Sequence, residues 1–331
     1  GQGNGKFFFD QGDGELTVRG GAVDLSRSHT DRIVFGAGIL ASDIQMSLEG
    51  TDLTNVRLNF NGSTDTILME NAIVSSSSSK HVTEFEFADG SVLNLAQIQN
   101  NPLYVTFTGD NQTFQRIYSP LAETTTINGS NNSILVGSGN SDFIDHGVGN
   151  QFYLPPAFSD AGTGGNVTVT VGRDTRITQG GGLDTFNIGI GSGFTTIQPF
   201  GTPLHQGDFD TINFGAGISA SSLYFWAPPV ASSQATAYDL NIDFAIGDKV
   251  ILTAGLVAGL DVPPNALTPK YVENFTFADG SSLTLDQVLA QGVHVIAFTD
   301  PFFGGPFIDR RFATWREITT VIGDNGQLYE G

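Results

Sequence analysis

Short runs that alternate apolar and polar residues occupy most of the chain, and glycine-rich turns separate them. In residues 31–39, Ile33 and Phe35 fall on one face of a strand, because side chains alternate with a period of two. The Gly-Ala-Gly sequence that follows ends this strand, since glycine frees the backbone. Residues 210–218 repeat the pattern almost letter for letter. We therefore predict the same short strand in both places.

A second pair of matching segments, residues 86–95 and 276–285, keeps the two copies in the same order. Each contains Phe-Ala-Asp-Gly-Ser between apolar runs. An Asp-Gly pair flanked by alternating apolar residues predicts a β-hairpin. Residues 96–99 and 286–290 are each predicted to add a helical turn. The chain thus contains one β-rich unit twice, which is typical of a modular array.

A shorter period of nine residues fills the middle of the chain. Three consecutive nine-residue strings occupy residues 128–154, and after a six-residue interruption the same phase resumes at Ala161. Each string predicts a turn of small residues followed by a short strand. We expect the eighth residue of each string to point inward, as a stacked β-solenoid requires. These residues are Leu135, Ile144, Tyr153, Thr168, Ile177 and Phe186.

Together the patterns predict an all-β protein, in which degenerate parallel β-roll or solenoid segments alternate with β-rich modules that contain hairpins. We predict five segments: a partial β-roll at 1–30, a first β module at 31–109, a central β-roll at 110–209, a second β module at 210–300, and the start of the next roll, a C-terminal assembly segment, at 301–331.

Composition narrows the choice of partners. The chain has 34 acidic and 14 basic residues, so its net charge is −20, which argues against nucleic acid or an anionic membrane. No apolar run is long enough for membrane insertion, and the chain has no cysteine for disulfides or thiolate metal sites. The acidic surface suits a calcium-rich medium, and it equally suits a surface that is charged for solubility.

The nine-residue strings resemble the RTX nonapeptide, Gly-Gly-x-Gly-x-Asp-x-apolar-x, and residues 179–187 are among the clearest copies. Residues 31–95 and 210–285 are similar to the haemolysin-type calcium-binding related domain of large secreted bacterial RTX proteins. The resemblance implies a parallel β-roll that binds calcium through turn carbonyls and the aspartate. It also implies an extracellular or cell-surface location.

The resemblance places the metal-binding aspartate at the sixth position of each string, where only Asp142 and Asp184 are acidic. Asn140 and Asp145 belong to the same string as Asp142 and complete the candidate calcium ligands. The other strings carry serine, glutamine, asparagine or threonine at this position. Ladders of asparagine and serine in place of ions are therefore the alternative.

Enzymatic motifs do not emerge from the sequence. The five histidines have no paired ligand spacing, and neither an HExxH string nor a Gly-x-Ser-x-Gly elbow occurs. We expect a protein that is not an enzyme. A polysaccharide-active enzyme with paired carboxylates is the weaker alternative, and aromatic stretches such as residues 224–226 make an extracellular polysaccharide a candidate ligand.

The two ends of the sequence match the repeat in complementary phase. Residues 310–331 align without gaps on residues 116–137, and residues 1–9 resemble 137–145, the string that would come next. We expect copies of the chain to join head to tail through open β-roll ends, forming a filament, sheath or surface layer. The predicted interface residues are Gly1, Phe7, Phe8, Phe9, Trp315, Leu328 and Tyr329. The alternative is a calcium-responsive, non-catalytic module of a large secreted RTX enzyme or adhesin.

Overall fold

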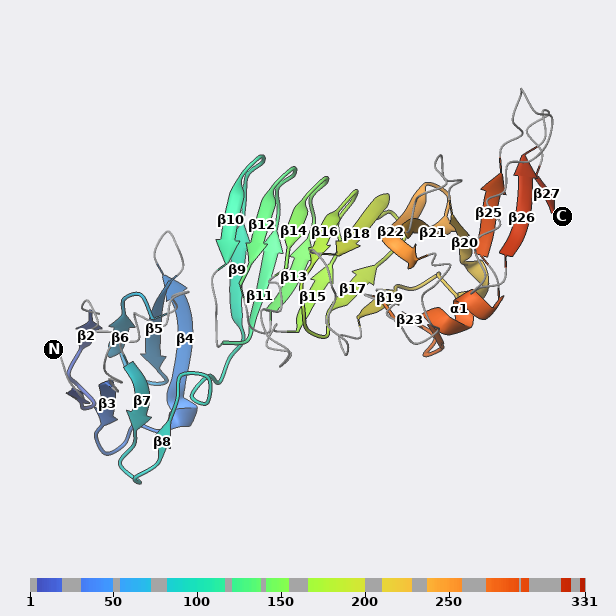
Figure 1. Cartoon of the computed structure of the whole chain (residues 1–331). Coiled ribbons are helices and arrows are strands. Elements are labelled where there is room, and N and C mark those ends of the chain that lie inside the picture. The colour runs from blue at the N-terminus through green and yellow to red at the C-terminus, as the bar shows by residue number, and fades with distance from the viewer. Residues whose placement is uncertain are drawn as a thin grey trace. The chain divides into compact units, whose positions relative to one another are not determined.

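A computed structural model gives the fold of the chain (Figure 1). It describes residues 5–19, 31–49, 54–72, 82–116, 121–137, 141–154, 166–199, 210–227, 237–257, 272–291, 293–297, 317–322 and 328–330. The chain divides into two compact units. Unit 1 comprises Gly1–Phe107, Gln115–Thr126 and Val136–Asp142, and unit 2 comprises Thr108–Phe114, Ile127–Leu135 and Phe143–Gly331.

Unit 1 is built on two four-stranded sheets, with the orders β1-β3-β7-β8 and β2-β6-β5-β4. Their elements are β1 (Lys6–Phe9), β2 (Glu15–Val18), β3 (Asp31–Phe35), η1 (Ala41–Asp43), β4 (Ile44–Glu49), β5 (Asn55–Phe60), β6 (Thr66–Met69), β7 (Val82–Glu86) and β8 (Val92–Leu93). Strands β1, β3 and β7 are parallel, and so are β2 and β6. The chain therefore coils from one sheet to the other.

The core of unit 1 contains side chains from both sheets. Phe9 and Phe35 are nearly or fully buried on the first sheet, and Phe60 reaches them from the second. The Phe9 and Phe60 rings stack with centroids 5.4 Å apart, and Phe35 lies 5.0 Å from Phe87. These aromatic contacts explain why phenylalanine recurs in the repeated motifs, since large rings fill the space between sheets.

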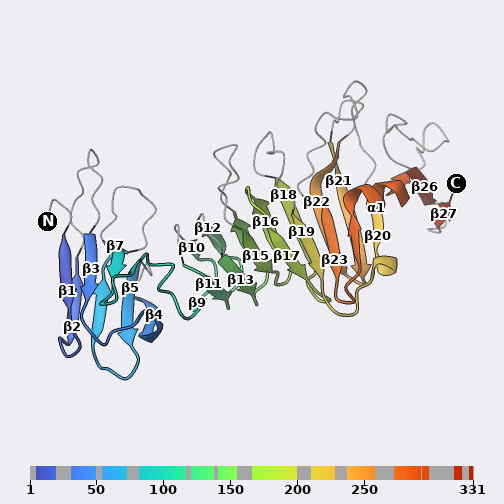
Figure 2. The same cartoon turned by 90° about the horizontal axis from the view of Figure 1, so that it is seen from below.

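Unit 2 is built in the same way, with more strands in each sheet (Figures 1 and 2). Its strands include the orders β24-β23-β19-β17-β15 in one sheet and β12-β14-β16-β18-β22-β21-β20-β25-β26-β27 in the other. The bounds are β12 (Ser133–Val136), β14 (Gln151–Tyr153), β15 (Val167–Thr170), β16 (Arg176–Gln179), β17 (Thr185–Ile188), β18 (Phe194–Pro199), β19 (Thr211–Phe214), η2 (Ala220–Ser222), β20 (Tyr224–Ala227), β21 (Ala237–Ala245), β22 (Asp248–Val257), β23 (Asn274–Phe277), β24 (Ser282–Thr284), α1 (Leu285–Gln291), β25 (Val293–Ala297), β26 (Glu317–Ile322) and β27 (Leu328–Glu330). The remaining strands are β9 (Leu103–Phe107), β10 (Thr113–Arg116), β11 (Glu123–Ile127) and β13 (Ser141–Asp145).

Stacked apolar side chains hold the parallel strands of unit 2 in register. In one sheet Phe152, Ile177, Ile197 and Leu252 are partners on β14, β16, β18 and β22. All four are buried. A second stack in the other sheet follows β15, β17, β19 and β23. The second repeated module thus adds its strands to both sheets of the roll. This confirms the predicted all-β roll.

The first module uses the same pairing plan in unit 1. Strands β1, β3 and β7 pair as β17, β19 and β23 do, and β2 pairs with β6 as β18 pairs with β22. Strands β21 and β22 have nine and ten residues, against six and four in β5 and β6. The two modules therefore share a topology and differ in the length of one hairpin.

The predicted local elements are confirmed except at residues 96–99, which form turns and not a helix. Hairpins join β7 to β8 and β23 to β24 in antiparallel pairs. Helix α1 covers the predicted helical turn at 286–290. Strands β3 and β19 end at the phenylalanine before the Gly-Ala-Gly sequence.

The predicted phase of the nine-residue strings was wrong by one residue in the first half of the roll. Leu135 and Tyr153 are 40% and 37% exposed, whereas their neighbours Ile134 and Phe152 are fully buried. Ile144 and Thr168 are also only partly buried. Phe152 pairs with Ile177, 25 residues later, which is two nine-residue periods and seven more. The insertion therefore has seven residues rather than six, and the predicted eighth position is correct only for Ile177 and Phe186.

The predicted next roll at 301–331 contains two described strands. β25 pairs in parallel with β26, and β27 pairs antiparallel with β26 in the same sheet. The five predicted segment boundaries stay a prediction.

Candidate functional site

The turns of the central roll are the place where the sequence predicts calcium. In unit 2 these turns stack directly on one another, with glycines at equivalent positions. A Cβ atom on Gly129 would lie 1.8 Å from the Gly109 carbonyl oxygen, and one on Gly147 would lie 1.9 Å from that of Gly129. Only glycine fits at such a distance. The stacked carbonyls therefore face the interval between successive turns.

Two buried asparagines fill these intervals, and we call Asn132 and Asn150 the asparagine ladder. The Asn132 side chain accepts a hydrogen bond from the Gln112 N–H at 2.8 Å and donates to the Gly109 carbonyl at 3.0 Å. Asn150 repeats this one turn later: it accepts from the Asn132 N–H at 2.8 Å and donates to the Gly129 carbonyl at 2.8 Å. Both side chains are fully buried.

Asp145 anchors the ladder to the next turn. One carboxylate oxygen accepts hydrogen bonds from the Gly147 N–H at 2.8 Å and from the Asn150 amide at 2.7 Å. The other accepts from the Thr175 hydroxyl at 3.0 Å. A buried carboxylate with three donors is well satisfied without a cation. Asp145 therefore connects two turns of the roll through protein groups.

A second set of acidic residues lies at the start of the strands in the other sheet. Asp184 accepts a hydrogen bond from the Val167 N–H at 2.9 Å, and Asp210 accepts from the Asp184 N–H at 2.7 Å. In unit 1, Asp31 accepts from the Gly5 N–H at 2.7 Å in the same way. The first aspartate of each repeated motif thus joins its own strand to the preceding coil.

Asp248, the first residue of β22, and Asp65, the residue before β6, form another matching pair of aspartates. The two oxygens of Asp248 accept from the Gly191 and Gly193 N–H groups, both at 2.8 Å. In unit 1, Asp65 accepts from Gly12 and Gly14 at 2.7 and 3.0 Å. Each carboxylate holds a glycine turn of the preceding coil. The two copies have therefore kept the same connection between coils.

These hydrogen bonds lower the pKa of Asp65 from its ordinary value of 3.8. The largest cause is the Gly12 N–H, followed by the Ser63 hydroxyl, and the Gly14 N–H adds to them while burial opposes them. Because the folded pKa is depressed, the stabilising contribution of Asp65 is complete above pH 3.8 and is lost as the pH falls through the folded pKa.

We therefore expect Asp65→Asn to be less stable than the parent chain at neutral pH, with a difference that shrinks in acid. Urea unfolding at a series of pH values from neutral to strongly acidic measures this difference. A gap between the two proteins that widens as the pH falls would contradict the assignment.

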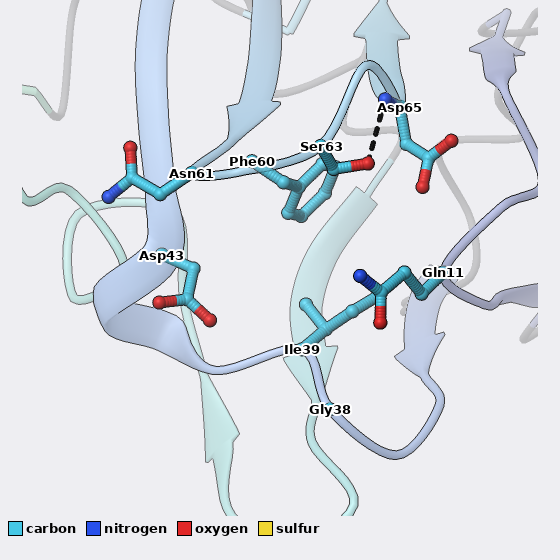
Figure 3. A pocket seen from close by; sticks show the side chains of 8 residues that line it. All are labelled: Gln11, Gly38, Ile39, Asp43, Phe60, Asn61, Ser63 and Asp65. Atoms are coloured by element: carbon cyan, nitrogen blue, oxygen red, sulfur yellow. Dashed lines mark hydrogen bonds between the residues drawn. The ribbon is translucent and has the colours of Figure 1, made fainter.

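A shallow pocket in unit 1 brings Asp43 and Asp65 to one depression, together with Gln11, Asn61 and Ser63 (Figure 3). The Ser63 hydroxyl accepts a hydrogen bond from the Asp65 N–H at 3.0 Å. Asp43 accepts from the Leu40 N–H at 3.2 Å. Both carboxylates of the pocket therefore support the local backbone, and the depression offers two acids that are already hydrogen-bonded.

The predicted calcium ligands are not gathered at one place. Asp142 is exposed on β13, and the neighbouring buried position belongs to Ser141. Asp145 and Asp184 are buried and hold the backbone bonds described above. Asn140 lies outside the described residues. Within the described ranges, no three histidine, aspartate or glutamate side chains form a group that could hold a metal ion. The calcium role of these four residues stays a prediction.

Of the predicted assembly residues, some are exposed, some are buried and others lie outside the described residues. Phe8 on β1 is 70% exposed, Phe9 is buried and Phe7 is partly buried against the core of unit 1. Leu328 and Tyr329 belong to β27. Gly1 and Trp315 lie outside the described residues.

The aromatic stretch 224–226 was the candidate for a carbohydrate contact. Phe225 is buried, and the Trp226 ring N–H donates to Asp243 at 2.8 Å. The Lys249 ammonium lies 4.5 Å from the centroid of the Trp226 ring. A cation over the ring face stabilises the local surface, so Trp226 has a structural partner within unit 2.

Sequence reasoning missed Asn132 and Asn150 because the phase error placed Ser133 and Gln151 at the sixth position. A count made on the buried apolar positions Ile134 and Phe152 would have found both asparagines, two residues earlier in each string. Asp65 and Asp248 occupy equivalent positions in the two modules, but the glycines that they hold are far away in sequence.

The chain is similar to known proteins over part of its length. Residues 55–97, which contain Asp65 and the β7–β8 hairpin, match the family model of the haemolysin-type calcium binding protein related domain. No curated protein sequence matches the chain. Among solved structures the chain is similar to the extracellular lipase LipA from Serratia marcescens, at 13% identity and a TM-score of 0.20. That alignment covers 78% of this chain and 37% of the lipase.

No helix in the described part of the chain is long and apolar enough to span a membrane. The family match covers residues 55–97, within the first module, and is a similarity of that segment.

Proposed function

We propose that this chain is an extracellular, non-enzymatic structural protein of the RTX type, whose β-rolls are continued head to tail by further copies. The observation that carries the proposal is the edge formed by β1 and β2. Each is the end strand of its sheet and pairs on one side only among the described strands. A parallel roll with such an edge needs a partner or a cap.

Both edge strands have backbone N–H and C=O groups that face away from the neighbouring strand. The Gly5 and Phe9 carbonyls accept from β3 and its following glycine at 2.8 and 2.9 Å. Since alternate residues of a parallel strand bond to opposite sides, Lys6 and Phe8 direct their N–H and C=O groups to the open edge. On β2, the Gly14 and Val18 carbonyls accept hydrogen bonds from the β6 side. The backbone N–H and C=O of Thr17 therefore face the open edge. Two parallel edges therefore offer hydrogen-bonding groups to one incoming coil.

A second copy is the occupant that fits this edge best. At the other end of the described chain, β26 pairs in parallel with β25, and β27 follows it antiparallel as the end strand of that sheet. The sequence of residues 310–331 matches residues 116–137, the segment that precedes the string most like residues 1–9. A contact between these different surfaces is heterologous, and such contacts propagate into open assemblies.

The use of polar groups supports a structural role. Asp31, Asp65, Asp145, Asp184 and Asp248 each accept hydrogen bonds from backbone N–H groups of the roll. Acid–base catalysis requires carboxylates that can reach a substrate proton. These carboxylates instead connect successive coils, which is what a long and regular protein needs.

Sedimentation velocity over a wide concentration range tests the proposal. We expect species larger than the monomer whose share grows with concentration. A single monomeric species at every concentration would overturn it.

A calcium-responsive, non-catalytic module of a larger secreted RTX enzyme or adhesin is the second candidate, and the family match at 55–97 favours it. In that case repeats of the same kind continue the roll within one polypeptide. Mass spectrometry of the native protein separates the two, because a mature chain that extends the roll covalently supports the module.

A further inference from the structure

We infer that the central roll of this protein is closed by asparagine side chains where the RTX resemblance implies calcium, so that the turns at 109–112, 129–132 and 147–150 form without the ion. The inference is independent of the assembly proposal. It concerns what occupies the space between stacked turns, which the hydrogen bonds of Asn132, Asn150 and Asp145 define.

The oxygen atoms that a cation would need are already engaged. Calcium takes six to eight oxygen ligands at about 2.3–2.6 Å. In the roll, the Gly109 and Gly129 carbonyls accept from the amide NH₂ groups of Asn132 and Asn150 at 3.0 and 2.8 Å. An amide N–H is the positive end of a dipole, and it takes the place of the positive ion toward these carbonyls. The nitrogen itself cannot serve as a calcium ligand.

The amide oxygens are engaged as well. Those of Asn132 and Asn150 accept the N–H groups of Gln112 and Asn132, both at 2.8 Å. A calcium ion placed here would have to break these bonds and leave buried N–H groups without acceptors, which is costly. Each asparagine therefore satisfies one donor and one acceptor of the preceding turn, as a single residue.

Space between the turns is filled by the same groups. A Cβ atom on Gly147 would lie 2.4 Å from the Asn150 amide nitrogen in addition to its clash with the Gly129 carbonyl. One on Gly129 would lie 2.9 Å from the Asn132 nitrogen. The interval that a methyl group cannot enter is occupied by the asparagine side chain.

The buried carboxylate of this layer is stabilised by neutral hydrogen-bond donors. Asp145 is its buried carboxylate, and it accepts from Gly147, Asn150 and Thr175. A calcium turn of the resembled kind needs an aspartate at each string. Here asparagine stands at Asn132 and Asn150, so these two positions do not supply the negative charge of an aspartate ligand.

Hydrogen exchange on the full chain tests this inference locally. Amides of residues 109–154 are expected to show the same protection in EDTA and in millimolar calcium chloride, with magnesium chloride as the control for ionic strength. Protection of these amides that appears only with calcium would overturn the inference, whatever calcium does elsewhere in the chain.

Aspartate substitutions give a second test with a matched control. Asn132→Asp and Asn150→Asp keep the shape but replace donors with a charge that faces a carbonyl. Asn131→Asp adds the same charge at an exposed neighbour. We expect faster exchange of residues 109–154 in EDTA for the first two variants and no change for the third. Equal behaviour of all three variants would refute the ladder.

Discussion

Replacing Asn150 with alanine is expected to lower the free energy of unfolding of unit 2 by about 3–5 kcal/mol. The substitution leaves the Asn132 N–H, the Gly129 carbonyl and one bond of Asp145 without their partner. Each unsatisfied buried group costs about 1–3 kcal/mol, and the cavity adds to this. Chemical denaturation followed by circular dichroism measures the loss.

Gln151→Ala is the matched control for this experiment. Gln151 is the next residue, it is only partly buried, and its side chain accepts one hydrogen bond from the Tyr153 hydroxyl. Its loss should cost less than about 1 kcal/mol. Similar losses for the two variants would mean that Asn150 supports the roll no more than a surface residue does.

The double variant Phe8→Pro and Thr17→Pro is expected to weaken assembly by about tenfold or more while leaving the monomer folded. Proline removes one N–H from each open edge, and two lost hydrogen bonds of about 1 kcal/mol correspond to that factor. The pairing of β1 with β3 and of β2 with β6 uses the alternate residues and remains intact. Sedimentation equilibrium on both proteins gives the two association constants.

Leu16→Pro is the control variant, because it removes an N–H on the opposite side of β2 from the open edge. Leu16 pairs with Ile67 across the β2–β6 ladder, on the side opposite to the open edge. This variant should destabilise unit 1 itself, because it removes a bond inside the sheet. Assembly that survives both edge prolines would show that β1 and β2 are not the contact surface.

Much of the architecture is predictable because it rests on local patterns. Ile33 and Phe35 alternate with polar residues, and an Asp-Gly pair follows Phe87, so strand and hairpin are legible within ten residues. The same reasoning located the roll and its nine-residue period. The phase failed because one extra residue lies in the insertion before Ile177, and a single-residue shift turns every side chain of a strand to its other face.

The hydrogen bonds between coils could not be predicted from the sequence, for a different reason. Asp65 and Gly12 lie more than fifty residues apart, as do Asp248 and Gly191. Only the stacking of coils brings each of these aspartates to its glycine turn. Asn132 and Asn150 likewise acquire their role from the turn above them, and their sequence alone is that of ordinary turn residues.

Electron microscopy of the purified chain tests the proposed head-to-tail assembly most directly, since continued rolls appear as particles longer than the monomer. The account predicts elongated head-to-tail assemblies in EDTA that become rarer in the Phe8→Pro, Thr17→Pro variant. Isolated monomers alone, in EDTA and in calcium alike, would contradict it.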